Sequence, residues 1–278
     1  MGNTSGICHL FGGLIMKSCD LPDTQNNLDT RQIIIDRVGI KDISHPITYV
    51  DRDGNKSPTV GNFTMTVTLP ENVKGTHMSR FIQILNEGPC EFDSSNFSKI
   101  IEKVRDRLES ETAHIVLDFP FFRKKKAPSS GVESMMDYQV TLYGSLDKGV
   151  TEVMMKVVVP VTSLCPCSKS ISKYGAHNQR SHITIKAKAA AGKTLYLEDL
   201  IDLAEKKASC ELYAILKRED EKVVTERAYD NPAFVEDLVR DIAVDLNANN
   251  NIDYYRLESE NFESIHNHSA YALIENQK

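Results

Sequence analysis

Apolar and polar residues alternate along several segments, and this pattern predicts strands with one buried face. The clearest segment is 63–69, where Phe63, Met65, Val67 and Leu69 are separated by polar residues. Similar or continuously apolar runs predict further strands at 47–50, 113–119, 138–142, 153–161, 182–187, 254–258 and 269–274. The loop between 119 and 138 carries a basic run, Arg123 to Lys126.

Apolar residues at helical spacing predict two pairs of helices. The first pair covers 79–86 and 96–108. The second pair covers 197–208, extended after a break by 211–216, and 231–246, where Asn231 and Pro232 provide an N-cap and first position. Each half therefore shows the order strand, strand, helix, helix, strand, strand.

This order predicts an α+β fold of two tandem units, each an antiparallel sheet with helices on one face. We expect an extension at 1–27, a first unit at 28–146 and a second unit at 147–278, with the junction near 144–150. The long outer strands leave open edges, which favour oligomerisation.

Composition narrows the class of protein without identifying it. The chain has 278 residues, of which 41% are hydrophobic and 26% charged, as in ordinary soluble domains. Its net charge of -6 argues against a general nucleic-acid or membrane partner. Six cysteines do not make a disulfide framework in a chain of this length, so we expect reduced thiols and a cytoplasmic protein. No apolar run reaches the length of a membrane span.

Two short segments concentrate residues that can bind a metal or transfer protons. Cys165 and Cys167 are followed by His177 and His182, and thiolate with imidazole suits a borderline-soft divalent metal. Farther on, Glu263 and His266 are three residues apart. The alternatives are small buried cysteines and a solvated polar loop, and His182 has the spacing of a residue on the polar face of a strand.

Other charged residues are candidates for binding a nucleotide. Glu236 stands beside apolar positions of a predicted helix, and a carboxylate accepts the two parallel hydrogen bonds that guanine or a pterin offers. The cations Arg123, Lys124, Arg180 and Arg218 can bind a polyphosphate. The alternatives are a charge on the flank of the helix and cations that serve solubility alone.

Several motifs in order resemble the type IB GTP cyclohydrolase I family, from about residue 29 to the C-terminus. These are LCPCSK at 164–169, YGAHNQRS at 174–181, LKR with DE at 216–221, NP with FVED at 231–237 and ESIHNH at 263–268. KGTHMSR at 74–80 and FPFFRKK at 119–125 also match. The resemblance implies tunnelling-fold units and a homotetramer with active sites at subunit interfaces. It also implies conversion of GTP and water to 7,8-dihydroneopterin triphosphate and formate, for folate and in many bacteria queuosine synthesis.

The resemblance also implies roles for individual residues. Cys165 would be a metal ligand, with His177 and Glu221 as co-ligands, and Glu263 and His266 would complete the shell or act as acid and base. Glu236 would anchor the purine. The family uses one zinc, manganese or iron ion per site and no organic cofactor. One departure is Glu219, where the family usually has proline.

Two other functions fit parts of the pattern. Nitrile reductases of the same fold class use a cysteine as nucleophile and NADPH as hydride donor, so Cys165 can be read as a nucleophile. The Cys-Pro-Cys and Glu-Ser-Ile-His sequences argue against that interpretation. The third hypothesis is a metal-stabilised binding protein without catalysis, which would unfold when its metal is removed.

Overall fold

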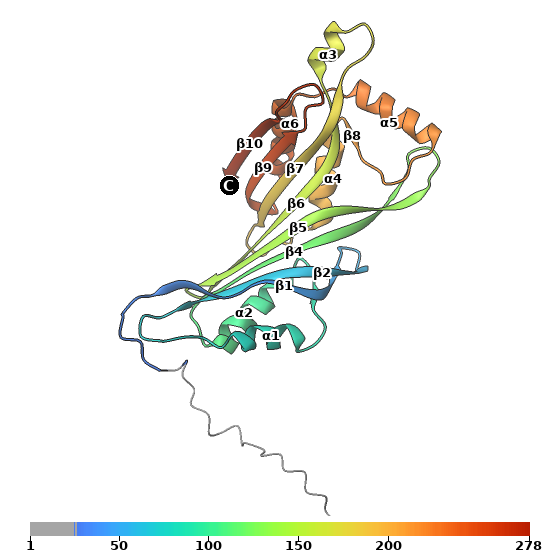
Figure 1. Ribbon diagram of the computed structural model, residues 1–278. Helices are drawn as coiled ribbons and strands as arrows, with labels where there is room; N and C mark the ends of the chain where they lie inside the picture. The colour runs from blue at the N-terminus through green and yellow to red at the C-terminus, as the bar shows by residue number, and fades with distance from the viewer. Residues whose placement is uncertain (1–24, 26) are drawn as a thin grey trace, which may run out of the picture.

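The computed structural model describes residues 25 and 27–278, and the extension predicted for 1–27 lies almost wholly outside them (Figure 1). The strands in these residues are β1 (Ile35–Val50), β2 (Lys56–Leu69), β3 (Glu91–Phe92), β4 (Ala113–Lys126), β5 (Glu133–Asp147), β6 (Val150–Leu164), β7 (Asn178–Ala189), β8 (Cys210–Glu211), β9 (Ile252–Asn261) and β10 (Ala270–Gln277). The helices are α1 (Met78–Asn86), α2 (Phe97–Leu108), α3 (Pro166–Ile171), α4 (Leu197–Lys207), α5 (Arg218–Asp230) and α6 (Val235–Ala248).

All ten strands belong to one sheet, in the order β10-β9-β7-β6-β5-β4-β2-β1-β3, with β8 beside β6. The expected junction near 144–150 is the tight turn between β5 and β6, which pair from Gln139 with Val158 to Asp147 with Val150. The sheet therefore runs through this junction without a break. The expected order of elements is also interrupted, because β3, α3, β8 and α5 are additional to it.

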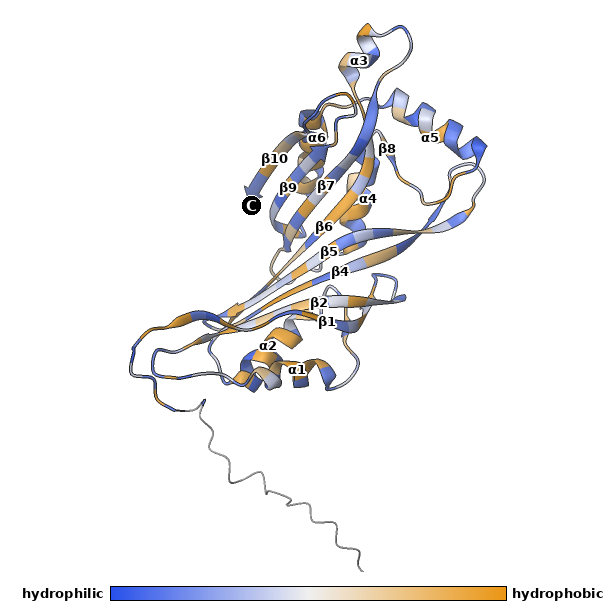
Figure 2. Cartoon of the chain, viewed as in Figure 1, coloured by the Kyte–Doolittle hydropathy of each residue, from blue (hydrophilic) through white to orange (hydrophobic). Residues whose placement is uncertain are grey.

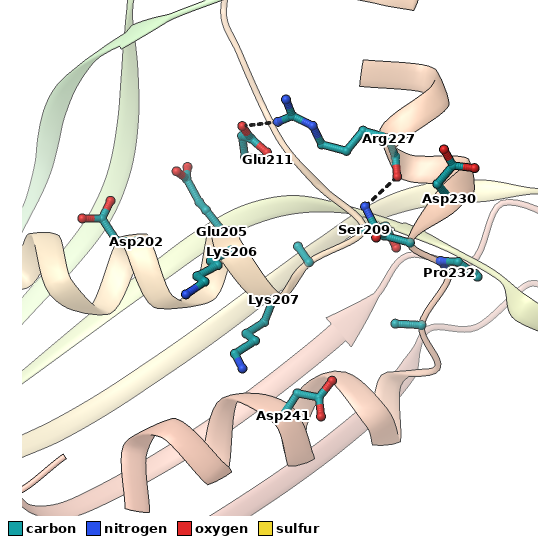
Figure 3. A pocket seen from close by; sticks show the side chains of 13 residues that line it. Asp202, Glu205, Lys206, Lys207, Ser209, Glu211, Arg227, Asp230, Pro232 and Asp241 are labelled. Atoms are coloured by element: carbon teal, nitrogen blue, oxygen red, sulfur yellow. Dashed lines mark hydrogen bonds and ion pairs between the residues drawn. The ribbon is translucent and has the colours of Figure 1, made fainter. Parts of the chain in front are cut away.

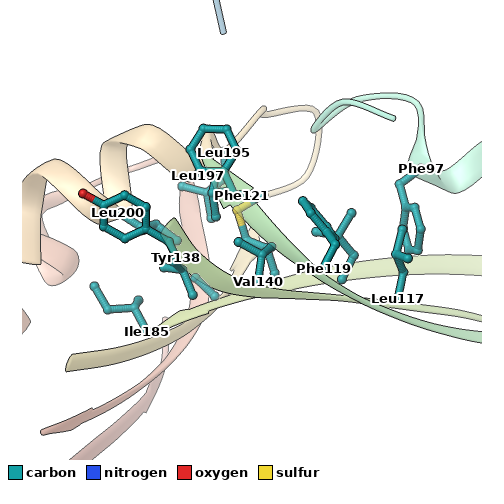
Figure 4. Close-up of a cluster of buried hydrophobic side chains, with 14 of the residues drawn as sticks. Phe97, Leu117, Phe119, Phe121, Tyr138, Val140, Ile185, Leu195, Leu197 and Leu200 are labelled. Atoms are coloured by element: carbon teal, nitrogen blue, oxygen red, sulfur yellow. The ribbon is translucent and has the colours of Figure 1, made fainter. Parts of the chain in front are cut away.

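Helices α1, α2, α4 and α6 pack against one face of the sheet. α2 contacts β4, β5 and β6, α4 contacts β6, and α6 contacts β9 and β10. The buried apolar side chains form one cluster that continues from Phe97 on α2 through Val140 on β5 to Leu200 on α4 (Figure 4). The hydropathy colouring shows the alternation along the strands that predicted them (Figure 2). Alternation works here because each strand has one face under the helices.

Three local predictions are wrong. The basic run Arg123–Lys126 is not in a loop but forms the end of β4, paired with residues 133–136 of β5. Residues 211–216 are not helical, because Glu211 pairs with Val161 as part of β8. Asn231 does not begin a helix; it follows α5, and α6 begins at Val235. Helix α5 has only two buried residues, Asp220 and Ala228, so it lacks the apolar face that predicts a helix.

The β4–β5 hairpin extends beyond its neighbours and is fastened to the second half of the chain. Its tip meets the first turn of α5, where Asp220 is fully buried. The carboxylate of Asp220 accepts hydrogen bonds from the backbone N–H groups of Ser129, Ser130 and Lys217 and from the Ser130 hydroxyl, at 2.6–2.9 Å. Farther along the hairpin, Lys125 contacts Glu205 on α4.

Both ends of the sheet leave backbone groups without a strand partner in the described chain. β10 pairs only with β9, and β3 covers β1 only at Thr48 and Tyr49. Apolar side chains gather before and at the start of β1, where Ile33, Ile34 and Ile35 are exposed. No helix of the described residues combines the length and the apolar character needed to cross a membrane.

Candidate functional site

Strand pairing brings Cys165 and His177 together. β6 and β7 are antiparallel, with Ser163 opposite Gln179 and Leu164 opposite Asn178, so the next opposite residues are Cys165 and His177. The backbone N–H of Cys165 donates to the carbonyl of His177 at 3.2 Å. The residues between them form α3 and a turn, in which the Ser168 hydroxyl donates to the Cys165 carbonyl at 3.1 Å. Cys165 and His177 therefore lie opposite each other just beyond the paired ends of β6 and β7.

Glu263 reaches the same place from the next strand. β7 and β9 pair with Ser181 opposite Asn261, so Glu263 continues this register opposite Gln179. Oε2 of Glu263 lies 3.8 Å from Nδ1 of His177, and both side chains are largely buried. Gln179 stands between them, with its Oε1 3.0 Å from His177 Nδ1 and its Nε2 3.4 Å from Glu263 Oε1.

The segment between α5 and α6 closes the site on a third side. The backbone N–H of Ala233 donates to the carbonyl of Leu164 at 3.2 Å, directly before Cys165. Lys169 of α3 lies 4.3 Å from the ring centroid of Tyr229 near the end of α5. Glu236 is exposed in the first turn of α6, three residues after Ala233. Segments that are far apart in sequence therefore meet around Cys165.

Two of the predicted ligands lie apart from this group within the described chain. His266 is exposed and stacks on His268, with ring centroids 5.1 Å apart. Glu221 is exposed in the first turn of α5. His182 points to the other face of β7, where its ring meets Phe262 edge to face, as expected for a residue on the polar face of a strand. Burial is the largest influence on the pKa of His182 and lowers it.

The four predicted anion-binding cations fall into two kinds. Arg123 is half-buried and paired with Asp202 on α4, and Lys124 pairs with Glu133 across the hairpin at 3.0 Å. Arg180 and Arg218 are exposed and form no ion pair with any residue that the structure describes. Arg180 also lines a hollow of about 430 Å³ on the sheet face opposite Gln179. Arg180 and Arg218 are thus available to an anion.

The donor chemistry at Cys165 fits a divalent metal, although the set is incomplete. A thiol, an imidazole and a carboxylate are the ligands that zinc takes in proteins. Within residues 25 and 27–278, however, no three His, Cys, Asp or Glu side chains are placed so that they could hold an ion. Cys165 and His177 are the two candidate donors that the β6–β7 register brings opposite each other.

A cavity of about 690 Å³ lies behind the 231–234 segment, between α4, α5 and α6 (Figure 3). Its charged lining residues are Asp202, Glu205, Glu211, Asp230 and Asp241 against Lys206, Lys207 and Arg227. Arg227 is paired with Glu211 at 2.7 Å, and Lys207 with Asp245 at 3.0 Å. With acids in excess and two of the cations already neutralised, this cavity is unsuited to a triphosphate.

Buried polar residues that were not predicted as site residues lie in the sheet beneath the site. Ser163, Gln179, Ser181, Ser259 and Asn261 are buried polar residues on one face of β6, β7 and β9. Gln179 Nε2 donates to Ser163 Oγ at 2.9 Å, and Ser181 Oγ donates to the same oxygen at 2.8 Å. Polar residues at the inward positions of otherwise apolar strands were the available sequence signal.

Comparison with known proteins gives strong similarity over nearly the whole chain. The family model described as type I GTP cyclohydrolase folE2 matches residues 21–272. A GTP cyclohydrolase FolE2 of Ruthia magnifica subsp. Calyptogena magnifica is 83% identical over 263 residues, covering 95% of this chain and 100% of that protein. A GTP cyclohydrolase FolE2 of Azoarcus sp. is 58% identical over 259 residues, covering 93% and 96%.

Solved structures give the fold alone. A hyperthermostable mutant of Bacillus sp. TB-90 urate oxidase matches with a TM-score of 0.53 at 10% identity, covering 88% of this chain and 99% of that one. A hyper-thermostable AgUricase mutant matches with a TM-score of 0.51 at 6% identity, covering 87% and 91%. The chain therefore has a tunnelling-like α+β fold similar to that of urate oxidase.

Proposed function

The chain belongs to the type I GTP cyclohydrolase folE2 family, and from this membership we infer that it is a GTP cyclohydrolase of folate synthesis. The observation that carries the inference is 83% identity to a named GTP cyclohydrolase along that protein's whole length. We further propose that it is of type IB and converts GTP and water to 7,8-dihydroneopterin triphosphate and formate. The same product would feed queuosine synthesis where that pathway is present.

We propose that Cys165 and His177 hold one divalent ion, zinc, manganese or iron, because strand register keeps them together in a donor set that suits such ions. When bound, the ion supplies a lowered pKa for a coordinated water at neutral pH. Glu263, whose carboxylate lies 3.8 Å from the same imidazole, would take and return protons in the hydrolysis of the C8–N bonds of guanine. Glu221 would join as a metal ligand and His266 as a ligand or an acid, and no organic cofactor would be needed.

Substrate orientation would fall to Glu236 and to the exposed cations. Glu236 would accept the N1–H and 2-amino hydrogens of guanine, because the segment before it is bonded to Leu164 beside the thiol. Arg180 and Arg218 would contact the triphosphate, because both are exposed and unpaired within the described chain. Arg123 and Lys124 contribute less, since internal carboxylates already neutralise them.

We propose that the enzyme is a cytoplasmic homotetramer with sites at subunit interfaces. Three observations on the described residues support this proposal: strand edges at β1 and β10 that have no partner among them, exposed apolar residues near β1, and a ligand set that these residues do not complete. The four described cysteines are free thiols, which suits a reducing compartment. The halves 28–146 and 147–278 are interpreted as two tandem tunnelling-fold units sharing the sheet.

The decisive experiment is GTP turnover by chelator-treated protein with zinc, manganese or iron restored, beside Cys165→Ala. Formate release and the fluorescence of the oxidised pterin are followed together. We expect both products with metal, and a loss of at least about 100-fold in the variant, because one metal ligand is removed. Folded protein that makes neither product with any metal would refute the proposal.

A further inference from the structure

The hydrogen bonds around Gln179 determine which nitrogen of His177 carries the proton. A carboxylate can only accept, so the Gln179 group that faces Glu263 Oε1 at 3.4 Å must be its NH2. The same NH2 faces Ser163 Oγ at 2.9 Å. The amide oxygen is therefore the atom 3.0 Å from His177 Nδ1, and it can only accept. Nδ1 of a neutral His177 must then be the protonated nitrogen.

Gln179 is itself held in a fixed position. It is 8% exposed, it stands directly opposite Ser163 in the β6–β7 register, and Ser163 also accepts from Ser181 at 2.8 Å. A buried amide whose hydrogens and oxygen are all engaged does not rotate freely, because each flip would leave buried polar groups unpaired. The carboxylate of Glu263 thus sets the amide orientation, and the amide sets the imidazole.

We propose that Gln179 is a positioning residue that locks His177 in the Nδ1–H tautomer and leaves the Nε2 lone pair free. Outer partners of this kind fix the ring orientation and basicity of ligating histidines. Within the proposed cyclohydrolase function, on which this part of the inference rests, the free lone pair is the one that His177 offers to the metal or to a proton. Gln179 touches neither substrate nor metal and acts only through His177 and Glu263.

The tautomer can be measured without substrate or metal. The ¹⁵N shifts of His177 in the metal-free protein distinguish a protonated Nδ1 from a protonated Nε2. We expect Nδ1–H in the wild type and a mixture of tautomers in Gln179→Met, which removes the acceptor that faces the ring. Ser259→Ala removes a buried hydroxyl from the same polar layer and should leave the tautomer unchanged, because Ser259 bonds Asn261 and not Gln179.

The hydrogen bonds that run from Glu263 through Gln179 to His177 lead to a second expectation, which a packing role of Gln179 alone would not give. Glu263→Gln can donate as well as accept, so the amide of Gln179 loses its fixed direction and His177 should become a mixture of tautomers. In Gln179→Met the affinity for Zn²⁺ and kcat should each fall about 10–100-fold, with KM for GTP within about twofold. Nε2–H in the wild type, or an unchanged tautomer in Gln179→Met, would overturn the proposal.

The two proposals can fail separately. If the tautomer shifts as expected but no variant of the chain consumes GTP, the positioning role stands and the function is wrong. If GTP is consumed normally and the tautomer of His177 is the same in Gln179→Met as in the wild type, the function stands and Gln179 is only a packing residue. Melting temperatures of all variants separate either result from a loss of folded protein.

Discussion

Breaking the ion pair between Lys125 and Glu205 should destabilise the fold without weakening GTP binding. The two side chains are 10% and 11% exposed, and Lys125 Nζ lies 2.8 Å from Glu205 Oε1. Tyr138 OH donates to the same oxygen at 2.7 Å, and Lys125 Nζ also lies 4.7 Å from the ring centroid of Tyr213. The pair fastens the β4–β5 hairpin to α4, which ties the basic run to structure and not to substrate.

The magnitude follows from the burial of both charges. Glu205→Gln keeps an acceptor for Tyr138 but leaves the Lys125 ammonium buried and uncompensated, which costs about 3–5 kcal/mol. Lys125→Met leaves the carboxylate uncompensated, at a similar cost. The double variant Lys125→Met/Glu205→Gln buries no unpaired charge, so its cost should be far below the sum of the single costs. We expect a coupling energy of about 2–3 kcal/mol.

Urea unfolding at a fixed protein concentration gives the three free energies, and steady-state kinetics give KM for GTP. Fixed concentration is needed because the proposed tetramer would add a concentration-dependent term to the apparent stability. If the free-energy cost of the double variant equals the sum of the two single costs within about 0.5 kcal/mol, the reasoning is refuted, because the two charges then do not interact. A large rise in KM for GTP in Lys125→Met, at temperatures where the variant is fully folded, would show that the basic run contributes to substrate binding.

Three further outcomes are expected. Burial raises the pKa of Asp220, but the Ser130 hydroxyl and the backbone N–H groups around it lower it more, to well below its usual 3.8. Its stabilising effect is therefore present above about pH 4 and is lost as the pH falls, so the melting-temperature gap between wild type and Asp220→Asn should narrow in acid; a constant gap would contradict this. Gly144→Ala places a Cβ 2.3 Å from Cδ1 of Ile101 and should cost about 1–3 kcal/mol in urea unfolding, part of which Ile101→Val restores. Glu236→Ala should lower kcat/KM for GTP about 100-fold or more by removing charged hydrogen bonds, and near-normal kinetics would exclude the anchoring role.

The sheet and its helices could be predicted wherever one face alone is buried. Phe63, Met65 and Val67 are inward and the residues between them are partly exposed, so the alternation in sequence identifies β2 correctly. The same reasoning misses α5, whose buried contact is the carboxylate of Asp220 and not an apolar stripe. It also misplaces the end of β4, because a strand of lysines and an arginine is stabilised by partners on another element.

The motifs drew attention to the candidate site but not to the hydrogen bonds within it. Sequence spacing suggested Cys165 and His177, and strand register explains why they meet across the β6–β7 pair. Gln179 lies within the YGAHNQRS motif and Ser163 directly before LCPCSK, but neither side chain carries reactive chemistry of its own, so neither was predicted as a site residue. Their importance depends on the direction of hydrogen bonds, which requires the positions of Glu263 and His177 together.

The continuous sheet explains why residues nearly a hundred positions apart share one site. In antiparallel neighbours the end of one strand lies beside the start of the next, so the end of β6, the start of β7 and the end of β9 meet at one edge. Cys165, His177 and Glu263 each lie one or two residues beyond these strand limits, where the backbone is free to present side chains.

Glu221 and His266 belong to a helix and an outer turn that the sheet register does not fix. If the proposed metal site and tetramer hold, the pair Cys165 and His177 should survive separation of the subunits, whereas full metal affinity should require their assembly. Zinc binding measured across a dilution series, with the oligomeric state followed in parallel, tests this division: affinity that is unchanged after dissociation would place every ligand within one chain.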